Sequence, residues 1–286
     1  MTQSIFKDNI FDGKVALVTG GATGIGAEMA FQLASHGAQV IIASRKADKI
    51  AAAAAGLSKL TGQTVEGREC NIRDRETVKN TVSDIVDQWG KIDILINNGG
   101  GQFMSPAEHI RSKGWDAVIE TNLTGTWNLT KQVAIQSMLK NGGSIINITM
   151  LTGRGFPGMT HSVAARAGVE AMTKTLAIEW AQKNIRINSI QPGIIASSGM
   201  RNYPHGVAIA EQTRPEIPMK RLGTCQEVAQ LALFLSSDAA QYVTGQVWAI
   251  DGGRSLWGKQ WPLPNPKQME PVVIPSWPWE QTDEDN

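Results

Sequence analysis

The chain has 286 residues, with 27 Lys and Arg against 26 Asp and Glu, so its formal net charge is +1 with neutral histidines. This balance argues against a broad basic surface, and we expect neither a nucleic-acid nor a membrane-surface partner. Hydrophobic residues make up 42% and charged residues 19% of the chain, which excludes a disordered protein and predicts a globular one.

Cysteine and histidine usage predicts neither a disulfide nor a metal site. Cys70 and Cys225 lie far apart, no CxxC motif occurs, and the four histidines are scattered singly. Reduced thiols are typical of a cytosol. The first residues lack a basic start followed by an apolar stretch, and the last residues, Thr-Asp-Glu-Asp-Asn, lack a peroxisomal address of the Ser-Lys-Leu type. We therefore expect a cytoplasmic protein without a signal peptide or membrane span.

Short apolar runs alternate with segments of helical period along the chain. Runs that suit strands buried on both faces of a parallel sheet lie at residues 15–18, 40–42, 94–96, 145–146 and 187–190. Between them, Ile25, Met29 and Leu33 repeat every fourth residue, as in a one-faced helix. This alternation predicts right-handed crossovers. We expect a single doubly wound (Rossmann) α/β domain over residues 1–256, with about seven parallel strands flanked by helices.

The composition changes in the last part of the chain. Residues 257–286 hold four of the nine tryptophans and six of the twelve prolines. Proline at this density breaks helices and sheets, so we expect an extended C-terminal tail. Its tryptophans are costly to leave in water, so they should be buried either on a neighbouring subunit or on the tail's own subunit.

A glycine-rich turn follows the first expected strand. It reads Thr-Gly-Gly-Ala-Thr-Gly-Ile-Gly and ends where helical periodicity begins. Glycine lets the backbone approach a diphosphate, whose charge is favoured by the free N–H groups and the positive dipole of the following helix. A glycine turn that binds no ligand is the alternative. The predicted dinucleotide contacts here are Gly20, Thr23, Gly24, Ile25 and Gly26.

The end of the second expected strand reads Ser44-Arg45-Lys46. Dinucleotide sites commonly place an acid about twenty residues after the glycines, on the ribose 2′-hydroxyl. Two cations at the start of the helix expected from Ala47 oppose its dipole unless an anion lies between them. A 2′-phosphate is such an anion, so we expect NADP(H). The alternative is that Arg45 and Lys46 are solvated, and Asp48 lies close to both.

Later motifs resemble the short-chain dehydrogenase/reductase family, over about residues 13–257. Asn97-Asn98-Gly99-Gly100 is similar to the family's Asn-Asn-Ala-Gly, Pro192-Gly193 to its nicotinamide-side motif, and Asp251-Gly252-Gly253 to its C-terminal signature. The resemblance implies an oxidoreductase, a homotetramer, and Asn122 as the catalytic asparagine. It also implies cofactor contacts from Cys70, Asn71, Ile72, Asn98, Gly99, Gly100, Pro192, Gly193, Ile195 and Ser197.

The residues at the family's catalytic Ser, Tyr and Lys positions depart from its pattern. Aligning SVAARAGVEAMTK with the family's tyrosine-to-lysine helix places Ser162 at the tyrosine and Arg166 at the lysine. Thr149, thirteen residues before Ser162, takes the serine position. A serine hydroxyl is too weak an acid to replace the phenol, and arginine stays protonated. Arg166 can still bond ribose hydroxyls and the cofactor, and Thr149 can still donate to a substrate oxygen.

The absence of the catalytic tyrosine's phenol favours the reduction of a C=C bond over the oxidation of an alcohol. Oxidising an alcohol requires a base for its hydroxyl proton, whereas reducing a conjugated C=C bond requires no acid at the oxygen, because donors can stabilise an enolate. The segments NNGGGQFMSPAEHIRSKGW, HSVAARAG and DGGRSLW resemble peroxisomal trans-2-enoyl-CoA reductases, and 2,4-dienoyl-CoA reductases share the ASRK and ARAG types of segment. The resemblance implies an unsaturated acyl-CoA substrate, with NADPH as hydride donor.

The sequence leaves the proton donor open. His161 adjoins Ser162 and can give a proton, or it is structural. In a second register Glu170 and Lys174 stand where the reductases show a Tyr-to-Lys spacing, although an i,i+4 ion pair is the simpler interpretation. Tyr203 could swing over the substrate or serve as an ordinary lid contact. Solvent water is the remaining donor.

Residues 198–221 mix methionines and cations among small residues. This composition suits a mobile lid that contacts an acyl chain and CoA phosphates, or alternatively a solvated loop. Two rival functions also stay open. One is an alcohol, aldehyde or β-ketoacyl oxidoreductase acting on a terpenoid or fatty substrate, with an unorthodox base such as His161. The other is a nucleotide-binding sensor without turnover.

Overall fold

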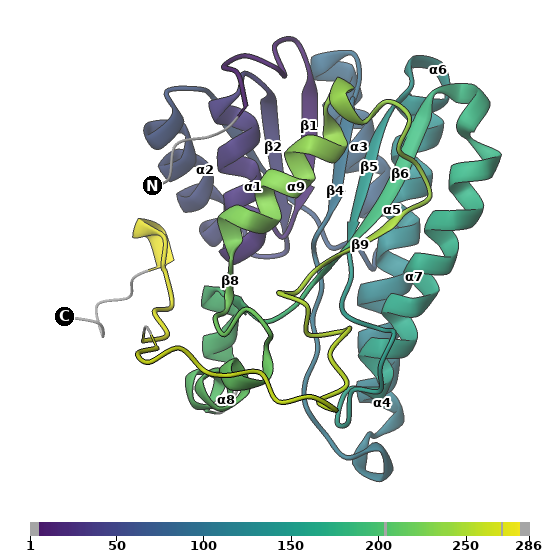
Figure 1. Ribbon diagram of the computed structural model, residues 1–286. Coiled ribbons are helices and arrows are strands. Elements are labelled where there is room, and N and C mark those ends of the chain that lie inside the picture. The colour runs from purple at the N-terminus through teal and green to yellow at the C-terminus, as the bar shows by residue number, and fades with distance from the viewer. Residues whose placement is uncertain (1–5, 203–204, 270, 281–286) are drawn as a thin grey trace.

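Seven parallel strands form one twisted sheet with helices on both faces in the computed structural model, which describes residues 6–202, 205–269 and 271–280 (Figure 1). The strand order is β3-β2-β1-β4-β5-β6-β9. In chain order these strands are β1 Val15–Thr19, β2 Gln39–Ser44, β3 Val65–Glu69, β4 Ile94–Asn97, β5 Gly143–Ile148, β6 Ile185–Pro192 and β9 Val247–Ile250. A separate parallel pair joins β7 Ile195–Ala196 to β8 Gly223–Thr224. The predicted doubly wound α/β fold is confirmed.

The helices that cover the sheet lie in two layers, and α8 lies beyond the carboxyl ends of the strands (Figure 1). In chain order they are α1 Gly24–Ser35, α2 Ala47–Thr61, α3 Arg75–Trp89, α4 Ser112–Ile119, α5 Gly125–Val133, α6 Leu139–Asn141, α7 Thr160–Glu179, α8 Gly206–Thr213 and α9 Cys225–Ser236. Helices α4, α5 and α6 form one continuous run, interrupted by wider π turns at Glu120–Thr124 and Ala134–Met138. No helix in the described part of the chain is long and apolar enough to cross a bilayer.

Alternate residues of the central strands face opposite layers, which explains their unbroken apolar runs. Val18 packs in the core with α1, α2 and α9, whereas Leu17 packs in the core with α3, α5 and α7. Both side chains are fully buried. Burial on both sides is typical of parallel sheets covered by crossover helices.

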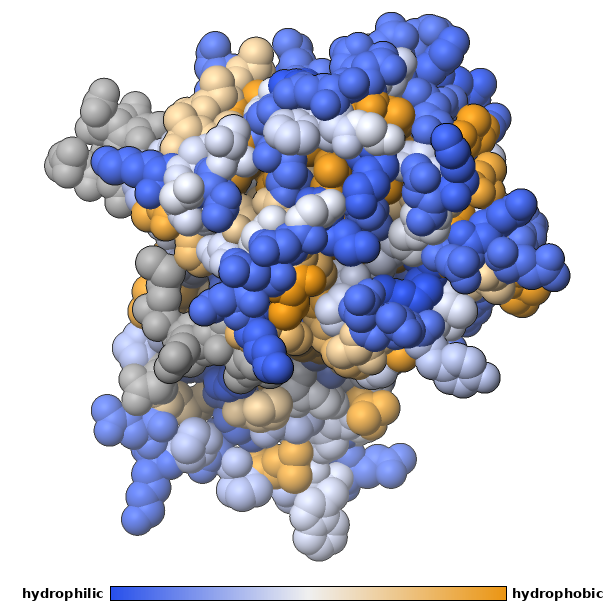
Figure 2. Space-filling model, turned by 90° about the horizontal axis from the view of Figure 1, so that it is seen from above, coloured by the Kyte–Doolittle hydropathy of each residue, from blue (hydrophilic) through white to orange (hydrophobic). Residues whose placement is uncertain are grey.

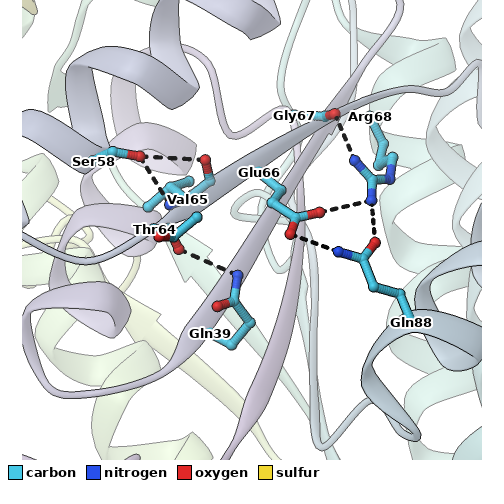
Figure 3. A network of polar contacts seen from close by, with 8 residues as sticks. All are labelled: Gln39, Ser58, Thr64, Val65, Glu66, Gly67, Arg68 and Gln88. Carbon is cyan, nitrogen blue, oxygen red and sulfur yellow. Dashed lines mark hydrogen bonds and ion pairs between the residues drawn. The ribbon is translucent and has the colours of Figure 1, made fainter.

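Strand β3 lies at the edge of the sheet and has a polar sequence, VEGRE. Arg68 Nη2 bonds Glu66 and Gln88 at 2.6 Å each, and Gln88 Nε2 donates to Glu66 at 2.9 Å (Figure 3). Ser58 Oγ of α2 accepts from the amide of Val65 at 2.9 Å. Polar contacts with α2 and α3 therefore hold this strand in the sheet, and its sequence needs no continuous apolar run.

The two ends of the sheet differ in character. The face over the amino ends of the strands is mostly hydrophilic, with hydrophobic residues scattered across it (Figure 2). The predicted site residues follow the carboxyl ends: Gly20 after β1, Asn98 after β4 and Thr149 after β5. In open parallel sheets, ligands bind at the carboxyl edge where the strand order reverses, which here is between β1 and β4.

In its described residues, 257–269 and 271–280, the C-terminal tail runs over the same chain as an extended segment, apart from a short turn at Pro278–Glu280 (Figure 1). Trp277 stacks on Trp279 with ring centroids 5.0 Å apart, and Phe31 of α1 lies 5.7 Å from Trp277. Trp261 is 77% exposed. The sequence leaves open whether the tail tryptophans pack on their own subunit or on a neighbouring one. Trp277 and Trp279 pack on their own subunit.

Candidate functional site

The turn between β1 and α1 is shaped by its glycines. Gly20 and Gly24 adopt positive φ angles of 62° and 50°, which glycine adopts without steric cost. A Cβ atom on Gly26 would overlap the carbonyl oxygen of Gly20 and the side-chain amide of Asn98. The N-cap residue Thr23 makes no side-chain cap bond, and the first turn of α1 holds no acidic residue. The positive end of this helix is therefore free to favour an anion.

A hydrogen-bond lock joins the loops that follow β1 and β4. Thr19 Oγ1 accepts from the amides of Asn98 at 3.0 Å and Gly99 at 2.9 Å. Asn98 Nδ2 donates to the carbonyl oxygens of Thr19 at 3.1 Å and Gly20 at 3.2 Å. Predicted cofactor contacts from two distant parts of the sequence thus meet at the reversal of strand order.

The cations predicted to bind a 2′-phosphate flank the start of α2. Arg45 and Lys46 are exposed, and Lys46 is the N-cap residue without a side-chain cap bond. Neither forms an ion pair with a residue in the described ranges. Asp48, in the first turn of α2, is also exposed. Both cations are available to a ligand at the end of β2.

The three predicted cofactor contacts after β3, residues 70–72, differ in the burial of their side chains. Cys70 and Ile72 are buried in the core, and burial raises the pKa of the Cys70 thiol. Asn71 Oδ1 accepts from the amide of Arg73 at 3.3 Å, and the carbonyl of Ile72 accepts from Asn128 at 3.1 Å. The predicted cofactor contacts at residues 70–72 stay predictions, with Asn71 the most accessible of the three side chains.

Arg166 of α7 reaches the loop after β4. Its guanidinium is almost buried and donates from Nη1 to the carbonyl of Ile148 at 2.6 Å. A Cβ on Gly100 would overlap this guanidinium and would lie 2.8 Å from Asn122 Oδ1. Asn122 is fully buried in the first π turn and bonds both the amide and the carbonyl of Gly101 at 2.9 Å. The structure therefore brings Arg166 and Asn122 together around Gly100.

Ser162 lies one helical turn before Arg166 and is fully buried. Its hydroxyl donates to Gln102 Oε1 at 2.5 Å and lies 3.5 Å from Met150 Sδ. Gln102 was missed by the sequence argument, although it directly follows the glycines after β4. Thr149 Oγ1 donates to the carbonyl of Ile190 at 3.2 Å, so its hydroxyl is engaged with the backbone in this arrangement.

The segment after β6 carries the remaining predicted contacts. The amide of Gly193, following Pro192, donates to the carbonyl of Ile250 at 2.9 Å. Ile195 begins β7. Ser197 lies beside the glycine-rich turn, because a Cβ on Gly24 would sit 3.5 Å from its Cβ. This segment thus borders the same turn as the loop after β4.

His161 is fully buried, with its ring edge-on to Phe103 at 4.4 Å and 74°. Neither ring nitrogen has a hydrogen-bond partner within the described ranges. Burial lowers the pKa of His161. The ring therefore favours its neutral form, and its catalytic role stays a prediction.

Acidification should destabilise the protein through His161. Below about pH 6.5, the ordinary histidine pKa, the unfolded chain takes up a proton that the buried ring resists, so the free energy of unfolding falls as pH drops. Urea unfolding at pH 7.5 and 5.5 measures this. Between pH 7.5 and pH 5.5, the free energy of unfolding of the wild-type protein should fall by up to about 1 kcal/mol more than that of His161→Leu. A pH-independent difference would contradict it.

Glu170 of α7 does not pair with Lys174. The prediction of an i,i+4 ion pair between them is wrong, because Glu170 instead accepts from Thr152 Oγ1 at 2.7 Å and from Gln191 Nε2 at 2.7 Å. The cause is burial, because Glu170 is 9% exposed while Lys174 points to solvent. Tyr203 lies outside the described residues, and its proposed role is not tested.

Most cations of the predicted lid are engaged within the protein. Arg214 pairs with Glu211 at 2.8 Å and Arg221 with Glu227 at 2.6 Å. Lys220 Nζ donates to the carbonyl of Pro215 at 2.7 Å. The contacts of Arg214 and Lys220 hold the lid's own turns together, and the Arg221–Glu227 pair ties the lid to α9.

A cavity of about 280 Å³ lies between the loop after β5 and the start of the tail. Three cations, one carboxylate and two aromatic rings are among its lining residues: Arg154, Arg254, Lys259, Glu216, Phe156 and Trp257. Lys259 pairs with Glu216 at 2.7 Å, and Arg254 lies over the ring of Phe156. These cations could not be predicted from the sequence, because residues 154 and 254–259 come together only in the fold.

A family model described as enoyl-(acyl carrier protein) reductase matches residues 20–255. The chain belongs to the short-chain dehydrogenase/reductase family. It is 39% identical, over 85% of its length and 98% of the relative's, to the 3-oxoacyl-[acyl-carrier-protein] reductase FabG of Thermotoga maritima. It is 36% identical to the peroxisomal 2,4-dienoyl-CoA reductase of Danio rerio, over 88% of this chain and 85% of that one. This short-chain dehydrogenase/reductase is also similar to a solved structure, the citronellol catabolism dehydrogenase AtuB of Pseudomonas aeruginosa PAO1, with a TM-score of 0.79, 40% identity, and coverage of 88% and 99%.

Membership of this family makes the protein an oxidoreductase with a nicotinamide nucleotide as its cofactor. The named relatives include both a ketoreductase and a dienoyl-CoA reductase. The chemistry of this short-chain dehydrogenase/reductase therefore has to be argued from its own site. No cluster of three or more potential metal-binding His, Cys, Asp or Glu side chains occurs in the described part of the chain.

Proposed function

We propose that the protein uses NADPH to reduce the C=C bond of a 2-enoyl-CoA or 2,4-dienoyl-CoA. The nucleotide fits the residues present, because the crowded turn at Gly26 and the uncapped start of α1 form a cradle suited to a diphosphate. When bound, the nucleotide supplies the hydride. Arg45 and Lys46 are exposed and form no ion pair with a described residue, which supports a 2′-phosphate and therefore NADPH over NADH.

The pair Ser162 and Arg166 is the observation that carries this proposal. The Ser162 hydroxyl already donates a short hydrogen bond to a carbonyl oxygen, that of the Gln102 amide. We infer that the thioester oxygen of the substrate replaces Gln102 as its acceptor. A neutral hydroxyl can stabilise an enolate oxygen as a donor, whereas it is too weak an acid to exchange a proton as a tyrosine does.

Arg166 and Asn122 prepare the neighbouring part of the site. The guanidinium is a permanent positive charge in a buried environment, where it favours negative charge that develops nearby. Asn122 fixes Gly101 by two hydrogen bonds and so sets the position of Gln102. These residues orient the acceptor and stabilise the anion, and the proton at carbon comes from a weak donor such as water.

The cavity between the loop after β5 and the tail supports a CoA ester. Arg154, Arg254 and Lys259 outnumber the single carboxylate, Glu216, in its lining. Guanidinium groups bind phosphates through paired hydrogen bonds, and aromatic faces stack on purine rings. Phe156 and Trp257 provide such faces beside the cations. We propose that this cavity receives the phosphates of the CoA.

An absorbance assay tests the proposed reaction. Purified protein is mixed with NADPH or NADH and with 2-enoyl-CoA, 2,4-dienoyl-CoA or 3-ketoacyl-CoA, and simple alcohols are tested with NADP⁺. We expect oxidation of NADPH with one of the unsaturated thioesters, at least about tenfold slower with NADH. Rapid interconversion of alcohols and ketones without turnover of unsaturated thioesters would refute the proposal.

The similarity to FabG and AtuB favours a second candidate, an oxidoreductase acting on a ketone or alcohol. That reaction needs a base, and His161 is the available unorthodox one. Its complete burial against Phe103 speaks against this use. The 3-ketoacyl-CoA and alcohol arms of the assay decide between the two, and nucleotide binding without turnover in any arm would favour a sensor.

A homotetramer is part of the proposal. Helices α5 and α7 and the second π turn expose large apolar side chains: Trp127 is 38%, Ile135 56% and Ile178 81% exposed. Exposed apolar groups on neighbouring helices are typical of subunit contacts.

A further inference from the structure

The last described residues of the tail, residues 277–280, form a hook that docks on the glycine-rich turn. Trp279 Nε1 donates to the carbonyl of Ala22, inside that turn, at 2.8 Å. The six-membered ring of Trp279 fills the space beside Gly56 of α2, where a Cβ atom would overlap it. In Figure 1 this yellow end of the chain lies beside α1 and α2.

The hook also binds the segment that starts the lid. Glu280 Oε1 accepts from Ser198 Oγ at 2.5 Å, and Oε2 accepts from the amide of Trp277 at 2.8 Å. A hydrogen bond to a carboxylate is stronger than one between neutral groups. The same hydroxyl borders the nucleotide cradle, because Ser198 Oγ lies 3.5 Å from the position of a Cβ on Gly24.

Earlier parts of the tail hold the same lid. The amide of Val272 donates to Glu211 Oε1 of α8 at 2.8 Å. Arg201, in the turn Ser198–Asn202, donates to the carbonyl of Ile274 at 3.3 Å. The tail therefore contacts the lid at these two points before its end contacts the glycine-rich turn.

We propose that the hook, residues 277–280, is a positioning element of the nucleotide site that ties the lid to the glycine-rich turn and slows the escape of bound nucleotide. The inference rests on the proposed nucleotide site. A nucleotide leaving the carboxyl edge of the sheet has to part the segment at Ser198 from the turn at Gly24. With the hook docked, that movement also has to break the contacts of Trp279 with Ala22 and of Glu280 with Ser198.

Stopped-flow fluorescence of bound NADPH, displaced by excess NADP⁺, tests this proposal. We expect Trp279→Ala and Glu280→Ala each to release NADPH about tenfold faster, equivalent to about 1.4 kcal/mol. Trp279→Phe keeps the ring and loses the N–H group, so it should fall between Trp279→Ala and wild type. Trp261→Ala is the matched control, because this exposed tail tryptophan lies away from the turn.

The outcomes separate the two proposals. Failure of the wild-type protein to bind NADPH or NADH would refute the nucleotide site itself. Wild-type binding with release rates in both alanine variants within about twofold of wild type would refute the hook alone. Tighter binding in the variants would also overturn it, since the Glu280 carboxylate would then be competing with the diphosphate. Circular dichroism of both alanine variants checks that a faster release is not due to unfolding, and Glu280→Gln, which keeps the shape and loses the charge, should also release NADPH faster than wild type.

Discussion

Arg166→Leu should abolish most of the activity, with kcat reduced by roughly 100-fold or more. The variant removes the permanent charge next to Gly100 and Asn122, and leaves the carbonyl of Ile148 without the donor that satisfies it at 2.6 Å. Loss of that charge-assisted bond should also lower the free energy of unfolding by about 1–3 kcal/mol. Steady-state kinetics with the best substrate and urea unfolding measure the two effects.

Arg166→Lys is the matched control for charge. Lysine keeps the positive charge but lacks the planar fork of the guanidinium, so activity should lie between those of wild type and Arg166→Leu. A folded Arg166→Leu variant with kcat within about threefold of wild type would show that the guanidinium plays no part in the reaction.

Gly26→Val should disable nucleotide binding. The added Cβ would overlap the carbonyl oxygen of Gly20 and the side-chain amide of Asn98, and both groups are fixed by the lock between the loops after β1 and β4. The turn therefore has to move away from the position that suits a diphosphate. We expect the Kd for NADPH to rise about 100-fold or more, equivalent to about 2.7 kcal/mol, with a lower melting temperature.

Isothermal titration and thermal unfolding measure both quantities. Gly26→Ala should act in the same direction with a smaller effect. Gly258→Ala is the control, because a Cβ there meets only Gln260 Cγ at 3.9 Å, and it should bind NADPH like wild type. Wild-type affinity in Gly26→Val would mean that nucleotide is not held by this turn.

The sequence predicts the central strands well because burial on both faces demands continuous apolar runs. Edge strands are harder to predict. Strand β3 has an exposed edge and is held by Arg68, Glu66 and Gln88, so its residues are polar and show no strand pattern. Strand β9 closes the other edge, and none of its four residues is fully buried. In both cases packing against the rest of the fold decides the structure.

The candidate site was predictable where a motif carries a backbone requirement, as at Gly20 and Gly26. It was less predictable where a side chain depends on the fold for its partner. Gln102 reaches Ser162 across sixty residues, and Glu170 exchanges its expected helical partner for Thr152 and Gln191 because it is buried. The hook could not be predicted, since nothing local to residues 277–280 indicates that Ala22 would accept from Trp279.

The lock at Thr19 has a kinetic consequence. One hydroxyl accepts from the two amides that begin the loop toward Gly100 and Gln102, so a restraint on the turn after β1 also restrains the loop that carries Gln102. A nucleotide bound at the turn after β1 thus orders the loop that carries Gln102 before the second substrate arrives. This coupling favours a compulsory order of addition, in which the dinucleotide enters first and the proposed thioester substrate second.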